Sequence, residues 1–306
     1  MTKFARRALV VFLIAGGVLL LLPKEKMPQT GQWMSRGGLT PHTVRVGRLD
    51  IRYVRAGAGP TLILIHGLAS SIYTWSDVIG PLAEKFDVIA LDLPGFGGSS
   101  QPGDLSFDDC PAAVLGLMDA LGVARAHFAG NSMGGAVSLL LAARMPARVD
   151  RVVILDSAGY RMKLGERPFL IRFIGSEAAG VLAEALPLRR LITRSGLRML
   201  MQDDTRVTDE RIDEYVAPFL REGALASARS LLRSPLDQRF VSGLAAIQAK
   251  TLVVWGRFDP WLPESDADRF VAEIKGARKV VLPTGHMPQE EKPVEVTRLI
   301  GEFLSS

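Results

Sequence analysis

Apolar and polar positions follow two periodicities along most of this chain. Short continuous apolar runs, bounded by glycine, proline or charged residues, recur at residues 61–65, 88–91, 126–129, 152–155, 251–255 and 279–282. Runs of this kind predict strands that are buried on both faces of a sheet. Between them, apolar residues recur with helical spacing over residues 75–85, 107–121, 133–144, 266–275 and 294–304. The alternation predicts an α/β domain with a mostly parallel sheet.

Two regions depart from this alternation. Residues 43–46 and 50–55 alternate between apolar and polar positions on either side of Gly47 and Arg48, which predicts an antiparallel hairpin. Residues 157–243 contain helical stretches rich in arginine and leucine but no convincing strand. We therefore expect a helical cap at residues 158–243, inserted between two parts of the core, residues 42–157 and 244–306. The cap would cover the sheet edge at which the carboxyl ends of the parallel strands meet.

The N-terminal residues 1–41 are predicted to form a membrane anchor and a linker. Residues 8–22 are uninterrupted apolar sequence between Arg7 and Lys24. This run is shorter than the roughly 20 residues that span a bilayer, but basic side chains at its ends can snorkel to extend it. No small-residue cleavage site follows, which favours a retained signal anchor over a cleaved signal peptide. The basic N-terminus then places the rest of the chain on the periplasmic or outer side of the inner membrane, and the glycine-rich residues 29–40 are read as the linker.

The net charge changes this picture little. The formal net charge is +5, and residues 1–36 account for all of it with six lysines and arginines against one glutamate. The remainder of the chain is neutral, so we expect no nucleic-acid partner. The single cysteine, Cys110, excludes an internal disulfide, and the four histidines are too scattered for a zinc site. The sequence therefore predicts no metal and no cofactor.

The strongest chemical signal is a G-x-S-x-G turn at residues 130–134, between a predicted strand and a predicted helix. A serine on such a turn, here Ser132, sits in strained backbone, and side chains at Gly130 or Gly134 would collide with neighbouring elements. The N-terminus of the following helix directs its N–H groups at the serine hydroxyl, which suits an oxygen that becomes negative. Ser132 is the candidate nucleophile.

A serine hydroxyl needs a base and a carboxylate that orients the base. The candidate base is His286, because it follows the last predicted strand on a loop that contains glycine and proline. The candidate acid is Asp259, four residues past the strand 251–255, which gives the order serine, aspartate, histidine. Asp156 also ends a strand and stays as the alternative acid, although the turn after it leads toward the cap.

The predicted oxyanion hole uses two backbone N–H groups, those of Leu68 and Met133. Met133 begins the helix after the nucleophile, and Leu68 lies in the loop after strand 61–65, where Gly67 permits an unusual backbone turn. His66 is expected to brace this loop. Asp92 is expected to hold its own glycine-rich loop through backbone N–H groups.

The cap contains a stripe of basic residues. Arg190, Arg194 and Arg198 are four residues apart and would share one face of a helix. Two interpretations are open: a helix lying on anionic lipid headgroups, or a charged, solvated face on a helix that packs into the cap.

Taken together, these motifs resemble the α/β-hydrolase superfamily over residues 42–306 outside the cap. They are residues 130–135, His66-Gly67, residues 92–97, Trp255-Gly256 with Asp259, and Gly285-His286. The N-terminal apolar segment, the GNSMGG turn, residues 155–159 and residues 285–293 are similar to membrane-anchored monoacylglycerol lipases and related bacterial lipases. This resemblance implies an α/β-hydrolase fold and the hydrolysis of small-molecule or lipid carboxylic esters, with lipid-like or short to medium acyl chains, through an acyl-enzyme on Ser132. The sequence makes no prediction of oligomeric state.

Two other functions stay open. The same turn resembles the carbon–carbon bond hydrolases of aromatic ring-cleavage pathways, in which an aromatic residue typically follows the catalytic histidine; here Met287 follows it. A non-catalytic, membrane-tethered binding module is the third hypothesis. A serine at position 132, rather than an aspartate, argues against haloalkane dehalogenases and epoxide hydrolases.

Overall fold

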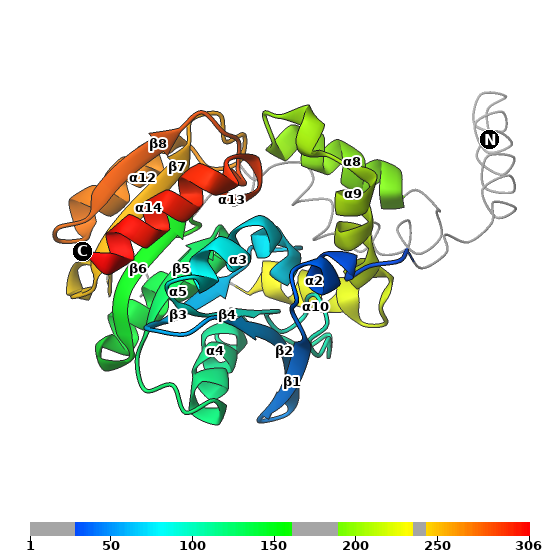
Figure 1. Cartoon of the computed structure of the whole chain (residues 1–306), viewed down its shortest axis with the longest axis horizontal. Coiled ribbons are helices and arrows are strands. Elements are labelled where there is room, and N and C mark those ends of the chain that lie inside the picture. The colour runs from blue at the N-terminus through cyan, green and yellow to red at the C-terminus, as the bar shows by residue number, and fades with distance from the viewer. Residues whose placement is uncertain (1–27, 161–188, 235–242) are drawn as a thin grey trace, which may run out of the picture.

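The computed structural model describes residues 28–160, 189–234 and 243–306. Its centre is an eight-stranded sheet with the order β1-β2-β4-β3-β5-β6-β7-β8 (Figure 1). The strands are β1 (Pro41–Val46), β2 (Leu49–Ala56), β3 (Thr61–Ile65), β4 (Asp87–Leu91), β5 (Ala126–Asn131), β6 (Val149–Leu155), β7 (Lys250–Gly256) and β8 (Arg278–Leu282). β2 pairs antiparallel with β1 and β4, and β3 to β8 are parallel. The predicted hairpin and mostly parallel sheet are confirmed.

The sheet is buried on both faces by helices. Along β3, Leu62 and Leu64 belong to one apolar cluster and Ile63 and Ile65 to the other, as the two-residue period of a strand requires. The first cluster includes α3 (Ser76–Ala83) and α14 (Pro293–Ser305), and the second includes α4 (Asp109–Ala120), α5 (Met133–Arg144) and α12 (Glu264–Glu273). The resulting three layers place the ends of β3 and β5 to β8 along one edge.

The helical insertion lies between β6 and β7, as expected. Its described helices are α8 (Arg189–Leu200), α9 (Asp209–Val216) and α10 (Ala224–Arg233), which stand beside the sheet in Figure 1. α8 and α9 share a small apolar cluster with a core residue, because Leu197, Ile212 and Val216 pack with Met287. Residues 161–188 and 235–242 of the predicted cap lie outside the described residues.

The linker prediction for residues 29–40 is wrong, since this segment contains a helix, α2 (Gln32–Arg36), that packs on the fold. Trp33 and Met34 are buried, and the Trp33 ring lies edge-on to Tyr73, with the two ring centroids 5.8 Å apart. The backbone N–H of Gly31 donates to Glu214 on α9, 2.5 Å away. The glycines suggested a flexible segment, but two adjacent large apolar side chains supply enough surface to fix it.

The predicted anchor, residues 8–22, lies outside the described residues. Among the residues that the structure describes, no helix combines the length and the apolar character needed to cross a bilayer.

The basic stripe on α8 is paired within the cap. Arg194 Nη2 lies 2.7 Å from Asp209 Oδ1 on α9, and Arg190 contacts both Asp209 and Asp213. This arrangement agrees with the second interpretation, a charged face on a helix that packs into the cap.

Candidate active site

Ser132 occupies a strained turn between β5 and α5. Its backbone has φ 53° and ψ −116°, a conformation that L residues rarely adopt. A Cβ added to Gly130 would lie 2.3 Å from the carbonyl oxygen of Gly134, and one added to Gly134 would lie 2.1 Å from that of Ile65. Both positions therefore exclude any side chain, which confirms the steric roles that the motif predicted.

The predicted base and acid lie together at the ends of neighbouring strands. His286 Nδ1 is 2.6 Å from Asp259 Oδ2, and both side chains are almost wholly buried. Asp259 Oδ1 accepts the backbone N–H groups of Trp261, at 2.7 Å, and Leu262, at 3.1 Å. Burial alone would raise the pKa of Asp259, but His286 and the two N–H donors outweigh it and hold that pKa below its ordinary value.

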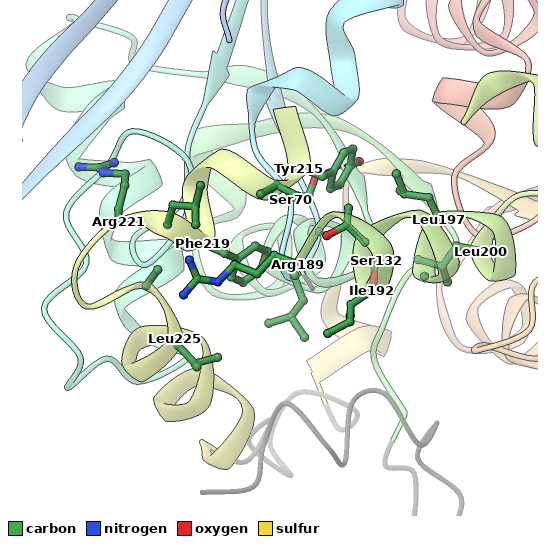
Figure 2. A pocket seen from close by; sticks show the side chains of 18 of the residues that line it. Ser70, Ser132, Arg189, Ile192, Leu197, Leu200, Tyr215, Phe219, Arg221 and Leu225 are labelled. Atoms are coloured by element: carbon green, nitrogen blue, oxygen red, sulfur yellow. Dashed lines mark hydrogen bonds between the residues drawn. The ribbon is translucent and has the colours of Figure 1, made fainter. Parts of the chain in front are cut away.

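Ser132 and His286 line the same cavity, whose volume is about 510 Å³. This is within the range of small-molecule sites. Most of the cavity wall is apolar and comes from the cap, as Figure 2 shows around Ser132. The large apolar residues that line the cavity are Leu68, Ile192, Leu197, Leu200, Val216, Phe219, Leu220, Leu225, Trp261 and Met287. The position predicted to be covered by the cap is thus the floor of an apolar cavity.

The two predicted oxyanion donors adjoin this floor. A Cβ added to Gly67 would lie 3.1 Å from the Cβ of Ser132, so the loop after β3 approaches the serine closely. Leu68 lines the cavity. Met133 is the first residue of α5, where backbone N–H groups have no partner within the helix.

His66 and Asp92 make the supporting contacts predicted for them. His66 Nε2 accepts the N–H of Leu93, at 2.9 Å, while its Nδ1 lies 2.7 Å from the carbonyl oxygen of Gly67. Burial lowers the pKa of His66, so this ring is a neutral brace. Asp92 accepts the backbone N–H groups of Ile72 and Gly98, each at 2.7 Å.

Asn131 is a site residue that sequence reasoning missed. Its side-chain Nδ2 donates to the backbone carbonyl oxygens of Leu155 and His286, each at 3.1 Å. The residue before Ser132 thereby holds the backbone of His286. The only sequence signal was its place inside the G-x-S-x-G turn.

The cap also holds the histidine loop, which sequence reasoning did not anticipate. The backbone N–H of His286 donates to the carbonyl oxygen of Leu200, the last residue of α8, at 2.8 Å. Glu291 Oε1 accepts the N–H of Gly285, and its Oε2 accepts that of Gln202, each at 2.7 Å. A Cβ on Gly285 would lie 2.1 Å from the Leu200 oxygen, so the glycine allows this close approach.

The contacts of Leu200 and Glu291 form a joint between the core and the cap. A buried polar network extends this joint. Glu290 lies on the short helix α13 (Pro288–Glu291), where its Oε1 accepts the hydroxyls of Thr74, at 2.6 Å, and Tyr215. Its Oε2 lies 2.8 Å from Nε of Arg211, which is also buried. Tyr215 and Ser70, hydrogen-bonded to each other, line the cavity beside Ser132 (Figure 2).

The alternative acid, Asp156, lies beside the preferred one. It follows the last residue of β6, has φ 43°, is wholly buried, and accepts the backbone N–H of Gly256 at 2.8 Å. Donor or acceptor atoms of Asp156, Asp259 and His286 all lie within 4.8 Å of one another. Because the 2.6 Å contact between His286 and Asp259 is a direct hydrogen bond, no gap is left between them for a cation.

Comparisons with known proteins show what this chain is similar to. The chain is 34% identical over 277 residues to a 2-hydroxy-6-oxo-6-phenylhexa-2,4-dienoate hydrolase of Comamonas testosteroni, covering 83% of this chain and 91% of that protein. It is 35% identical over 280 residues to the dihydrolipoyllysine-residue acetyltransferase component of an acetoin-cleaving system of Pseudomonas putida, covering 87% and 70% of the two chains. A crystal structure of a membrane phospholipase A matches with a TM-score of 0.71 and 29% identity, covering 100% of this chain and 98% of that one.

A family model described as the alpha/beta hydrolase fold matches residues 60–293, which include Ser132, Asp259 and His286. The chain therefore belongs to the α/β-hydrolase family.

Proposed function

We propose that this protein is a serine hydrolase that cleaves carboxylic esters with lipid-like or short to medium acyl chains. The observation that supports the proposal is the largely apolar cavity of about 510 Å³ that both Ser132 and His286 line, with Asp259 hydrogen-bonded to the histidine. An apolar cavity with a few polar groups at one end suits a molecule with one reactive group and an apolar body.

In this mechanism Nε2 of His286 takes the proton of the Ser132 hydroxyl as its oxygen attacks the ester carbonyl. The tetrahedral intermediate collapses when His286 gives that proton to the leaving alcohol. A water molecule, deprotonated by His286, then attacks the acyl-enzyme and releases the acid and free Ser132. Asp259 holds the ring and stabilises its positive charge between these steps.

The N–H groups of Leu68 and Met133 are proposed to hold the oxyanion in both tetrahedral intermediates. Each such donor contributes on the order of 3 kcal/mol to transition-state stabilisation in acyl-transfer enzymes. Their placement is supported by the close approach of Gly67 to Ser132 and by the start of α5 at Met133.

We further propose that residues 8–22 tether the enzyme to the membrane and that residues 158–243 act as its substrate-selecting cap. The apolar run of residues 8–22 supports the tether. The 29% identity to a membrane phospholipase A over the whole chain supports a lipid ester as substrate. The narrower likeness to monoacylglycerol lipases stays a prediction.

Carbon–carbon bond hydrolysis is the second candidate. It is favoured by the 34% identity to a dienoate hydrolase, which uses the same family of folds. Against it stands Met287, at the position where an aromatic residue typically follows the histidine in such enzymes.

One experiment separates the candidates. The full chain is labelled with a fluorophosphonate, and turnover is then measured for p-nitrophenyl and monoacylglycerol esters of increasing chain length beside a vinylogous diketone. We expect labelling at Ser132 and preferential ester turnover, both lost in Ser132→Ala. Faster turnover of the diketone would select the second candidate. Failure of Ser132 to label would support the non-catalytic binding module.

A further inference from the structure

Asp156 is a buried acid for which the mechanism above has no use. One of its carboxyl oxygens, Oδ1, accepts the N–H of Gly256 at 2.8 Å. The other, Oδ2, is buried and has no N–H donor among the described residues. Three titratable groups face it: Asp259 after β7, His286 after β8, and Glu291 on α13.

Two neighbouring carboxyl groups in a buried site do not both ionise, because each charge raises the cost of the other. Asp259 is the carboxyl group of the pair that carries the negative charge, because its two oxygens face His286 and the N–H groups of Trp261 and Leu262. Asp156 receives a single backbone donor. The proton shared by the pair therefore belongs on Asp156.

We propose that Asp156 is protonated at neutral pH and donates a hydrogen bond from its buried oxygen to Asp259, so that it is a positioning residue for the acid of the site. This inference rests on the proposed function for the role of Asp259, although the protonation of Asp156 does not depend on any activity.

Two observations support this assignment. Burial, followed by the charge of Asp259, raises the pKa of Asp156 well above its ordinary value. Its backbone also adopts φ 43°, an unfavourable conformation for a residue other than glycine, and the turn keeps the carboxyl group inside the fold. The extra donor completes the set of hydrogen bonds around Asp259 and keeps it from rotating away from His286.

The first test is infrared spectroscopy of the full chain at neutral pH. The wild-type spectrum minus that of Asp156→Asn should contain the C=O stretch of a protonated carboxylic acid. Subtraction removes the contributions of other buried acids, such as Glu290 and Glu291. A difference spectrum with carboxylate bands only would overturn the proposal. Because this measurement needs no turnover, its result does not depend on whether the proposed function is correct.

The second test compares Asp156→Asn with Asp156→Leu in pH profiles of kcat/KM. The asparagine keeps an N–H donor in the same place, so kcat/KM should stay within about threefold of wild type, and the acidic limb of the profile should not move. The leucine removes the donor to a charged group and should lower kcat/KM by about 10- to 100-fold. If Asp156 were ionised, the asparagine variant would lose a negative charge beside the base, and its acidic limb would move to lower pH. That result, or equal losses in both variants, would contradict the proposal.

Discussion

The edge of the core and the cap hold the same histidine by different means. From the core, Asn131 binds the carbonyl oxygen of His286, and from the cap, Leu200 binds its N–H. The core side is fixed by close backbone packing, in which Gly130 and Gly134 leave no room for a methyl group. The cap side depends largely on side-chain carboxylates, those of Glu290 and Glu291, which accept donors from the cap.

The cap therefore helps to hold the histidine loop in place, in addition to covering the cavity. If the core alone positioned the catalytic groups, changes in the joint would affect substrate binding and leave the histidine in place. The contacts from Leu200 and Glu291 to the histidine loop indicate that such changes also reach His286.

Ser132→Ala should lower kcat by about 10⁶-fold with little change in stability, as in other enzymes that use this chemistry. The matched control is Ser138→Ala on α5, the helix that follows Ser132; the Ser138 hydroxyl donates to the carbonyl oxygen of Gly134 at 2.8 Å. This control should keep full turnover and lose about 1 kcal/mol of stability. Ester hydrolysis and thermal unfolding of both variants provide the check. Equal turnover in the two variants would contradict the catalytic role of the core edge.

Glu290→Ala should destabilise the protein by about 3–5 kcal/mol, because it removes the buried carboxylate beside Arg211 and leaves that side chain, among the described residues, only the more distant, partly exposed carboxylate of Asp77. The measurement is urea unfolding of the whole chain. As a control, Glu302→Ala breaks an exposed pair with Arg298 and should cost less than about 1 kcal/mol. Similar small losses in both variants would show that the joint contributes little to holding the cap.

Asn131→Ala should lower kcat/KM by about 10- to 100-fold, because the histidine backbone loses its support from the core. Steady-state kinetics with an ester substrate, beside fluorophosphonate labelling rates, provide the measurement. Unchanged kinetics would mean that the contacts from the cap are sufficient to position the loop that carries His286.

The pH dependence of stability should distinguish Asp156 from its asparagine variant. The raised pKa of Asp156 means that the folded state keeps a proton that the unfolded state loses above pH of about 3.9. The unfolding free energy of the wild type should therefore fall, relative to Asp156→Asn, by up to about 1.4 kcal/mol per pH unit as pH rises from 3.9 to the folded pKa. Denaturant unfolding at a series of pH values measures this difference. Parallel curves for the two proteins would contradict a protonated Asp156.

Arg194→Gln should have the smallest effect, less than about 1 kcal/mol, because its pair with Asp209 is largely exposed. Urea unfolding and ester turnover should both stay close to wild type. A large loss of stability would show that the pairing between α8 and α9 holds the cap more firmly than its exposure suggests.

The sequence predicted the core well because its signals are local. The limits of β3 and α5 match the predicted residues 61–65 and 133–144, since both elements show a clear apolar period between strong turn signals. Ser132, Asp259 and His286 were predicted as site residues in the same way, each from its place shortly after a strand, and the structure brings Ser132 and His286 to one cavity with Asp259 bonded to His286.

The missed features depend on contacts between segments that lie far apart in the chain. Asn131, Glu290 and Glu291 are ordinary polar residues in the sequence, and their partners lie on distant elements. Asp156 lies close to Asp259 because β6 pairs with β7. The positions of the apolar runs along the sequence do not specify which strands are neighbours in the sheet. The helix α2 was missed because the glycines on both sides of it predict a linker, whereas the packing of the adjacent Trp33 and Met34 is visible only in the structure.

The packing of α2 has a consequence for where the chain tolerates cleavage. The ring of Trp33 lies on Tyr73, and the ring of Tyr73 lies 6.1 Å from that of Tyr215, which lines the cavity. A proteolytic cut just before β1 would release Trp33 and leave Tyr73, the ring next to Tyr215, without the ring that packs on its far side. Residues 31–36 therefore belong with the catalytic unit, and a trimmed enzyme that begins at β1 would bind its substrate in a looser chamber.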